Sequence, residues 1–152
     1  MPRERIAMSG EEVAAFLRYQ LTAVLATHGP GGFPHQSAMW FVPDEDGGVR
    51  MWTYRASQKA VNLRRDPRAS LLVESGEDYR ALRGVLLVGE VRVVDDLERT
   101  LDVGLRLRQR YGERYGLETV EVLAAQAKKR VVLELRPAHV ASWDHGRQQA
   151  RS

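Results

Sequence analysis

Two turn-forming stretches near the start of the chain constrain its fold more than any other feature. The first, at residues 28–32, separates strand-like runs at residues 21–27 and 34–42, and the second, at residues 43–48, leads into another run at residues 49–54. Clusters of glycine and proline between such runs mark tight turns, and hence antiparallel hairpins. Two successive hairpins predict an antiparallel sheet and argue against the regular βαβ alternation of a doubly wound parallel sheet.

Three further strands and four helices are predicted along the rest of the chain. Strands are expected at residues 69–74, 79–94 and 130–140, and the glycines at 84 and 89 predict a bulge or bend in the longest of them. Helices are expected after the capping-box pair Ser9 and Glu12, from Ser57 to Asp66, from Asp95 or Asp96 to about Tyr111, and over residues 118–127. Six strands linked mostly as hairpins favour a small, mainly β barrel with flanking helices.

The composition is that of an ordinary globular protein. With 152 residues, of which 43% are hydrophobic, the chain is long enough to bury a core, and we expect a single domain over residues 1–152. Cysteine is absent, which excludes disulfides and thiolate metal ligands. No apolar run approaches the roughly 18 residues of a membrane helix, and no signal-peptide core precedes residue 8, so we expect a cytoplasmic protein without a membrane partner. The net charge of +3 is mild and suits an anionic small molecule at least as well as nucleic acid, which we do not expect as a partner.

The run from Trp52 to Arg68 is the strongest candidate for a ligand site. It has the pattern of a strand end, a tight loop and a short helix that opens with Ser57, Gln58 and Lys59. The free N–H groups and the dipole at such a helix start attract anions. A lysine in the first turn is unfavourable for the dipole unless a phosphate lies there. The alternative is that Ser57 is only an N-cap and Lys59 a solvated side chain.

Other kinds of chemistry have little support. No pair among the histidines at 28, 35, 139 and 145 has the helical spacing of a metal site, and a site at His139 and His145 would need acids from elsewhere, so we expect no metal. The nucleophile-elbow, Walker and dinucleotide-binding glycine motifs are all absent, which leaves hydrolase and kinase functions without a positive signal.

The aromatic residues are few but grouped. Trp40, Phe41, Trp52 and Tyr54 fall on the two strands that flank the turn at residues 43–48. On a paired sheet they would wall a flat ligand. The alternative is ordinary packing in the core or at a dimer contact, which is the commoner use of aromatic side chains.

Four segments of the chain carry a family resemblance. They are TAVLATHGPGGFPHQSAMWFV, VRMWTYRASQKAVNLRRDPRASLLVE, YRALRGVLLVGEVRVVDD and the closing HVASWDH. Their order resembles the pyridoxamine-phosphate-oxidase-like flavin split-barrel superfamily, over about residues 17–145. Within it, the chain is most similar to the deazaflavin (coenzyme F420)-dependent oxidoreductases of the split-barrel type, and the stretch at residues 57–68 is the most specific part. The resemblance implies a six-stranded antiparallel split β-barrel and a homodimer with two cofactors at its interface.

The resemblance also implies a set of cofactor-binding residues. The cofactor phosphate would lie at Ser57, Gln58 and Lys59, the residues already singled out for an anion. The ring system would lie along the second and third strands, at His35, Gln36, Ser37, Trp52, Thr53 and Tyr54. Asn62 belongs to the same matched stretch, Arg55 and Arg64 would serve the acidic tail of the deazaflavin, and Tyr79 and Trp143 would reach a cofactor from the partner chain.

Three function classes are compatible with this resemblance. The first is a reductase that uses reduced F420 to transfer a hydride to a small unsaturated acceptor, the second an FMN-dependent oxidoreductase, and the third a non-catalytic flavin-binding protein. The chain lacks the C-terminal arginine–histidine pattern of a true pyridoxamine phosphate oxidase, which disfavours vitamin B6 oxidation. The arginines around the short helix exceed what one phosphate requires and favour the more anionic deazaflavin, unless Arg64 and Arg65 are only a solvated face. No catalytic residue is assigned, because the cofactor carries the chemistry.

Overall fold

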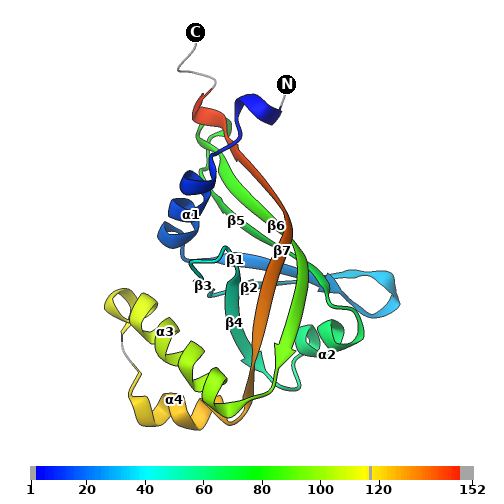
Figure 1. Ribbon diagram of the computed structural model, residues 1–152, viewed down its shortest axis with the longest axis vertical. Coiled ribbons are helices and arrows are strands. Elements are labelled where there is room, and N and C mark those ends of the chain that lie inside the picture. Colours follow the sequence, from blue (N-terminus) through cyan, green and yellow to red (C-terminus); the bar gives the residue numbers. More distant parts are fainter. Residues whose placement is uncertain (1–2, 117, 148–152) are drawn as a thin grey trace.

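The chain forms one antiparallel sheet of seven strands that curls into a split half-barrel (Figure 1). The computed structural model describes residues 3–116 and 118–147. The strands, in the spatial order β2-β1-β5-β6-β7-β4-β3, are β1 (Ala23–His28), β2 (Pro34–Met39), β3 (Val42–Pro43), β4 (Val49–Tyr54), β5 (Arg68–Ser75), β6 (Arg83–Val94) and β7 (Arg130–Asp144). The helices are α1 (Gly10–Tyr19), α2 (Gln58–Arg65), α3 (Leu97–Tyr115) and α4 (Val120–Ala127), with 3₁₀ turns η1 (Arg3–Arg5), η2 (Pro30–Gly32) and η3 (Tyr79–Ala81).

The main core fills the inside of the curled sheet. Alternate side chains along the strands point inward, and Leu25 and Leu133 among them are fully buried. α1 packs Phe16 against this core and α2 packs Leu63 against it. Each such side chain contributes about 1.5–3 kcal/mol on burial, so both helices are held to the sheet mainly by their apolar faces.

A second, smaller core lies on the opposite face of β4 and β7, beneath α3. Val132 of β7 and Val103 of α3 are buried there, and Trp52 packs against them. The helix approaches the sheet closely because position 104 is glycine, where an added Cβ would lie 2.6 Å from Trp52 Cζ3.

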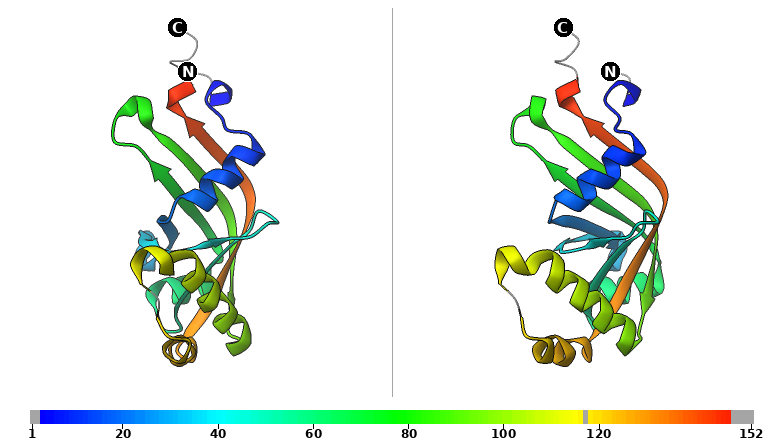
Figure 2. Two further views of the ribbon diagram at one scale, coloured as in Figure 1. Left: turned by 90° about the vertical axis from the view of Figure 1, so that its left-hand side faces the viewer. Right: turned by 60° about the vertical axis from the view of Figure 1, so that its left-hand side comes forward.

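β4 therefore separates two environments. Val49, Met51 and Thr53 alternate with Arg50, Trp52 and Tyr54 along the strand, and the first set faces the main core while the second faces α3. Figures 1 and 2 show the same division, with α2 on one side of β4 and α3 with α4 on the other. Within the described residues, no helix is both long enough and apolar enough to cross a membrane.

The mainly β, split-barrel prediction is confirmed, although the sheet has seven strands rather than six. The run predicted at residues 34–42 divides into β2 and β3 because the backbone leaves the ladder at Trp40 and Phe41. The N–H of Phe41 donates instead to the hydroxyl of Tyr111, at 3.0 Å. The capping box of Ser9 and Glu12 is present at the start of α1, as predicted.

Three other predicted boundaries are wrong. The strand expected from residue 79 begins at Arg83, because Asp78 caps a 3₁₀ turn over residues 79–81. α3 continues past Gly112, which is buried, to Tyr115, and Gly116 caps it with a φ of 91°. β7 extends to Asp144 through its pairing with β6.

The two glycines of β6 have different roles. The register shifts at Val88 and Gly89, so the bend predicted at Gly89 is present. Gly84 instead leaves room for a ring, since a Cβ there would lie 2.3 Å from Trp143 Cζ2.

Candidate functional site

The start of α2 is organised by the hydroxyl of Ser57. Its Oγ accepts hydrogen bonds from the backbone N–H of Ala60 at 3.3 Å and from Thr53 Oγ1 at 3.1 Å. The hydrogen of the Ser57 hydroxyl is therefore free to donate to a ligand. The N–H groups of Gln58 and Lys59 open the helix and have no intrahelical acceptor. These donors gather at the positive end of the helix dipole, where an anion is favoured.

Lys59 adds an ammonium group to the same place. Its side chain is half-buried, and its Nζ donates a hydrogen bond to Thr53 Oγ1 at 3.2 Å. Burial lowers the pKa of Lys59 below its ordinary value, and no carboxylate in the described part of the chain opposes that effect. A desolvated ammonium without a counter-charge is a group that a bound anion would stabilise.

Asn62 ties α2 to the sheet. Its side chain is fully buried; Nδ2 donates to Thr27 Oγ1 at 3.1 Å, and Oδ1 accepts from Gln58 Nε2 at 2.7 Å. Arg65 also donates to the carbonyl of His28, at 2.6 Å. The structure thus gives Asn62 a positioning role for the helix, and its predicted direct contact with a cofactor stays a prediction.

Two of the three predicted β2 residues carry unused polar atoms on the inner face. His35 lies opposite Thr27 in the β1–β2 register, and Ser37 lies opposite Leu25. His35 Nδ1 and Ser37 Oγ are buried and have no hydrogen-bond partner within the described residues. Native proteins rarely leave such atoms unsatisfied, so both are candidates for ligand contacts. Gln36 alternates to the other face and is exposed.

Trp52 and Tyr54 point away from the start of α2. The guanidinium carbon of Arg130 lies 4.4 Å from the ring centre of Trp52 and 4.7 Å from that of Tyr54. A hydrogen bond from Arg130 lowers the pKa of the exposed Tyr54 hydroxyl. Of the three consecutive residues predicted to contact a ring, only Thr53 shares a face with Ser57 and Lys59, and the period-2 alternation of a strand is the signal that predicts this.

The arginines near α2 already have protein partners. Arg55 pairs with both carboxylate oxygens of Asp95, at 2.9 and 3.0 Å, and its hydrogen bond lowers the pKa of that exposed carboxyl. Arg64 donates to the carbonyl of Arg55 at 2.9 Å. Among Arg55, Lys59 and Arg64, only Arg55 has a carboxylate partner within the described residues.

The two residues predicted to act from a partner chain lie at the far end of the molecule. Tyr79 is exposed on η3 and meets the ring of His145 edge-on at 4.6 Å. Figure 1 shows the loop between β5 and β6 at the end of the molecule opposite α2, and Trp143 pairs with Gly84 beside it. One chain alone therefore does not bring either residue to the start of α2.

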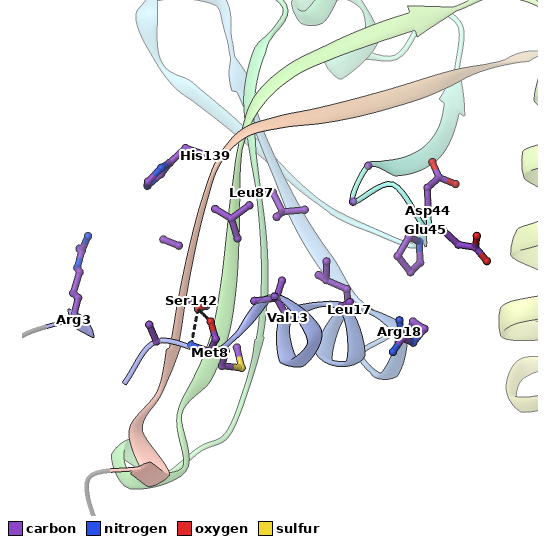
Figure 3. Close-up of a pocket in the computed structure, with 18 of the residues that line it drawn as sticks. Arg3, Met8, Val13, Leu17, Arg18, Asp44, Glu45, Leu87, His139 and Ser142 are labelled. Carbon is purple, nitrogen blue, oxygen red and sulfur yellow. Dashed lines mark hydrogen bonds between the residues drawn. The ribbon is translucent and has the colours of Figure 1, made fainter. Parts of the chain in front are cut away.

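One large hollow of the described chain could not be predicted from the sequence. It is an apolar groove of about 740 Å³ between α1, the part of β7 near His139, and the turn after β3 (Figure 3). Val13, Leu17 and Leu87 face into it, and a hydrogen bond of 2.9 Å from the N–H of Met8 to Ser142 Oγ fixes the chain before α1 at its edge. Its walls come from segments far apart in the sequence, so no local sequence motif predicts it.

No cluster of three or more histidine, aspartate or glutamate side chains suited to a metal occurs among residues 3–116 and 118–147. His139 lines the groove just described, whereas His145 contacts Tyr79.

A family profile described as pyridoxamine 5′-phosphate oxidase matches residues 9–144 of this chain. No match was found among curated proteins. Solved structures do resemble it: a conserved hypothetical protein of Mycobacterium tuberculosis, Rv2991, is 38% identical with a TM-score of 0.83, over 95% of this chain and 90% of that one.

Two further solved structures share the fold of this chain. An F420 reductase is 28% identical with a TM-score of 0.69, covering 84% of this chain and 94% of that one. An FAD-binding protein of Mesorhizobium loti shares the fold at 15% identity, with a TM-score of 0.66 over 90% of this chain and 94% of that one.

Proposed function

Since the chain belongs to the pyridoxamine 5′-phosphate oxidase family, we propose that it is an oxidoreductase that binds coenzyme F420 and reduces a small unsaturated organic molecule. The observation that carries the proposal is the half-buried ammonium of Lys59 beside the open start of α2. The likeness to an F420 reductase favours the deazaflavin over FMN. FMN-dependent oxidation–reduction is the second candidate, supported by the same anion site, and non-catalytic flavin binding is the third.

The residues present fit such a cofactor. Ser57, the N–H groups of Gln58 and Lys59, and Lys59 Nζ would hold the phosphate. His35 Nδ1 and Ser37 Oγ, both unsatisfied, would meet polar atoms of the ring system. His35 Nδ1 and Ser37 Oγ have no partner in the described residues, and the Ser57 hydroxyl and the Lys59 ammonium keep further hydrogens to donate.

This chain contributes binding and orientation rather than a catalytic side chain. When bound, reduced F420 supplies a hydride to an electron-poor carbon of the acceptor. Thr53 fixes Lys59 by a 3.2 Å hydrogen bond, and Asn62 fixes α2 by its bond to Thr27, so the phosphate end of a cofactor would be held on rigid elements. We assign no residue to protonate the product, because a solvent water molecule would serve as the proton donor.

Competition titrations of F420 and FMN test the choice of cofactor. We expect tighter binding of F420, with an advantage that shrinks as salt rises, because Arg64 and Arg55 border the same helix and exposed charges are screened. The 2.9 Å pair of Arg55 with Asp95 makes that advantage small. Equal affinities at low salt, or a preference for FMN, would favour the second candidate. Binding of either cofactor without turnover of any acceptor would favour the third.

Lys59→Ala tests the site itself. Removing a charged hydrogen-bond donor should weaken binding of either cofactor by about 1.5–3 kcal/mol. Lys128→Ala is the matched control, because it removes one exposed lysine and leaves the Lys128 carbonyl that accepts from Arg55. If Lys59→Ala binds the cofactor with unchanged affinity, then Lys59 does not contact it and Ser57 acts only as an N-cap.

A further inference from the structure

A hollow lined by arginines lies on the face of the sheet that α3 covers. It measures about 340 Å³ and is bounded by β4, β6 and β7 and by the first two turns of α3. Its charged lining consists of Arg50, Arg92, Arg99, Asp102, Glu134 and Arg136. Four guanidinium groups thus face two carboxylates, which leaves the hollow with an excess of two positive charges.

The sheet register fixes most of these charges in place. Arg50 of β4, Glu134 of β7 and Arg92 of β6 are direct cross-strand neighbours. The next row of the same face contains Val132, which is fully buried under α3. A slip in register would bring core residues to the wrong face, so the spacing of the arginines is strongly specified.

The carboxylates do not neutralise the four arginines of the hollow. Glu134 pairs with Arg50 at 3.5 Å, and Arg50 is also held by Asp44 at 3.1 Å. Arg92, Arg99 and Arg136 are exposed, and in the described chain their side chains make neither an ion pair nor a hydrogen bond. The remaining carboxylate of the lining, Asp102, is also unpaired. Glu90 lies directly across the ladder from Arg136 and from Arg68, so it is shared between two arginines and does not line the hollow.

We propose that this hollow binds a compact oligophosphate such as pyrophosphate or tripolyphosphate. The planar fork of arginine matches phosphate oxygens in a bidentate way, and the excess of positive charge in the lining favours a ligand with several negative charges. The apolar lining is limited to Val103 and Val132, which are 2% and 0% exposed, and the described lining includes no aromatic ring. A nucleobase would have no platform to stack on, which favours the free oligophosphate over a nucleotide.

This site is separate from the start of α2. Arg50 faces α3, whereas Thr53 on the same strand faces α2 and Lys59. The two anion sites therefore lie on opposite sides of β4, and a ligand at one does not occupy the other.

Calorimetric titration of the full chain with tripolyphosphate tests the proposal. We expect saturable binding that weakens roughly tenfold or more in Arg92→Gln/Arg99→Gln, because two charge-assisted contacts are lost. Arg80→Gln/Arg114→Gln makes the same charge change at exposed positions outside the hollow and should bind as the wild type does. Arg136→Gln alone should weaken binding in the same direction, and thermal unfolding checks that each variant is folded.

Two further titrations separate this hollow from other anion sites. Lys59→Ala removes the anion site at α2 and should keep the component of tripolyphosphate binding that depends on Arg92 and Arg99, and ATP should bind there more weakly than tripolyphosphate. Loss of binding in Lys59→Ala would assign the anion to α2 and overturn the proposal. Tighter binding of ATP would identify a nucleotide site instead. If both arginine double variants bind tripolyphosphate equally weakly, the loss reflects the lower net charge of the protein and the proposal is overturned.

Discussion

At the scale of single residues, Lys59 carries a partly buried ammonium group whose charge a bound anion would stabilise. Its pKa is lowered because burial penalises the charged form, and only the protonated ammonium attracts a phosphate. Cofactor affinity should therefore be constant at lower pH and fall as the pH rises through the lowered pKa of Lys59. Lys59→Arg should keep its affinity over the same range, because a guanidinium stays protonated. Fluorescence titrations of F420 between pH 7 and 10 measure this difference, and parallel pH profiles for the two proteins would exclude Lys59 from the binding site.

A second prediction at this scale concerns the substitution of Asn62. Asn62→Ala would leave the buried hydroxyl of Thr27 without its donor and should lower the free energy of unfolding by about 1–3 kcal/mol. Cofactor affinity should also fall, because α2 loses one of its two hydrogen-bonded anchors to β1 and keeps only that of Arg65 to His28. Val61→Ala, at a 45% exposed position of the same helix, is the control and should leave the free energy of unfolding and the cofactor affinity nearly unchanged. Denaturant unfolding with and without cofactor distinguishes a structural role from direct binding: if Asn62→Ala lowers affinity and not stability, then Asn62 contacts the cofactor.

The sequence could bring together the residues of the proposed anion site but not predict its geometry. A hydroxyl, an amide and a lysine at a helix start are a local pattern, and they lie together in the structure. Trp52 was expected to contact the ring along with Thr53, yet strand alternation sends it to Arg130 and α3. The unsatisfied atoms of His35 and Ser37 depend on which elements cover β2, and no local pattern specifies that.

At the scale of elements, α3 depends on a close approach that only glycine permits. A Cβ at position 104 would lie 2.6 Å from the ring of Trp52, so Gly104→Ala must push the helix or the indole aside. We expect a loss of about 1–3 kcal/mol in the free energy of unfolding, as for other overpacked cores, with a shift in tryptophan fluorescence. Gly10→Ala, where nothing lies within 4 Å of the added Cβ, is the control. Equal stability of Gly104→Ala and the wild type would mean that α3 is not tightly packed on β4.

Element boundaries failed where tertiary contacts override local signals. The strand expected at residues 34–42 breaks because Tyr111, far along the chain, accepts the hydrogen bond that Phe41 would donate to a ladder. α3 runs through Gly112 because that glycine is buried rather than exposed at a helix end. The order and type of the elements were predictable, because apolar periodicity and glycine-rich turns are local.

At the scale of the whole molecule, one face of the sheet is apolar and uncovered in the single chain. Its rows, set by the pairing of β1, β5, β6 and β7, contain the apolar side chains of Val24, Ala26, Leu72, Leu86, Val88 and Ala141, interrupted by Ser70 and His139. These side chains are half-buried or exposed, which is unusual for a contiguous apolar surface of a monomer. The homodimer implied by the family resemblance would cover such a face, and only a second chain would bring Tyr79 and Trp143 near the start of α2.

We therefore expect a dimer at micromolar concentration by light scattering, and we expect Val88→Glu to dissociate it. Val88 is 38% exposed on β6 in the single chain, and a carboxylate there would have to be buried without a partner in the dimer. Val122→Glu, at a 41% exposed position of α4, introduces the same charge away from this face and should remain dimeric. If a cofactor needs residues from both chains, Val88→Glu should also lose F420 binding while keeping its fold by circular dichroism. A wild-type monomer would exclude the dimer, and dissociation by Val122→Glu and not by Val88→Glu would place its interface elsewhere. Either result would leave this face of the sheet without a function.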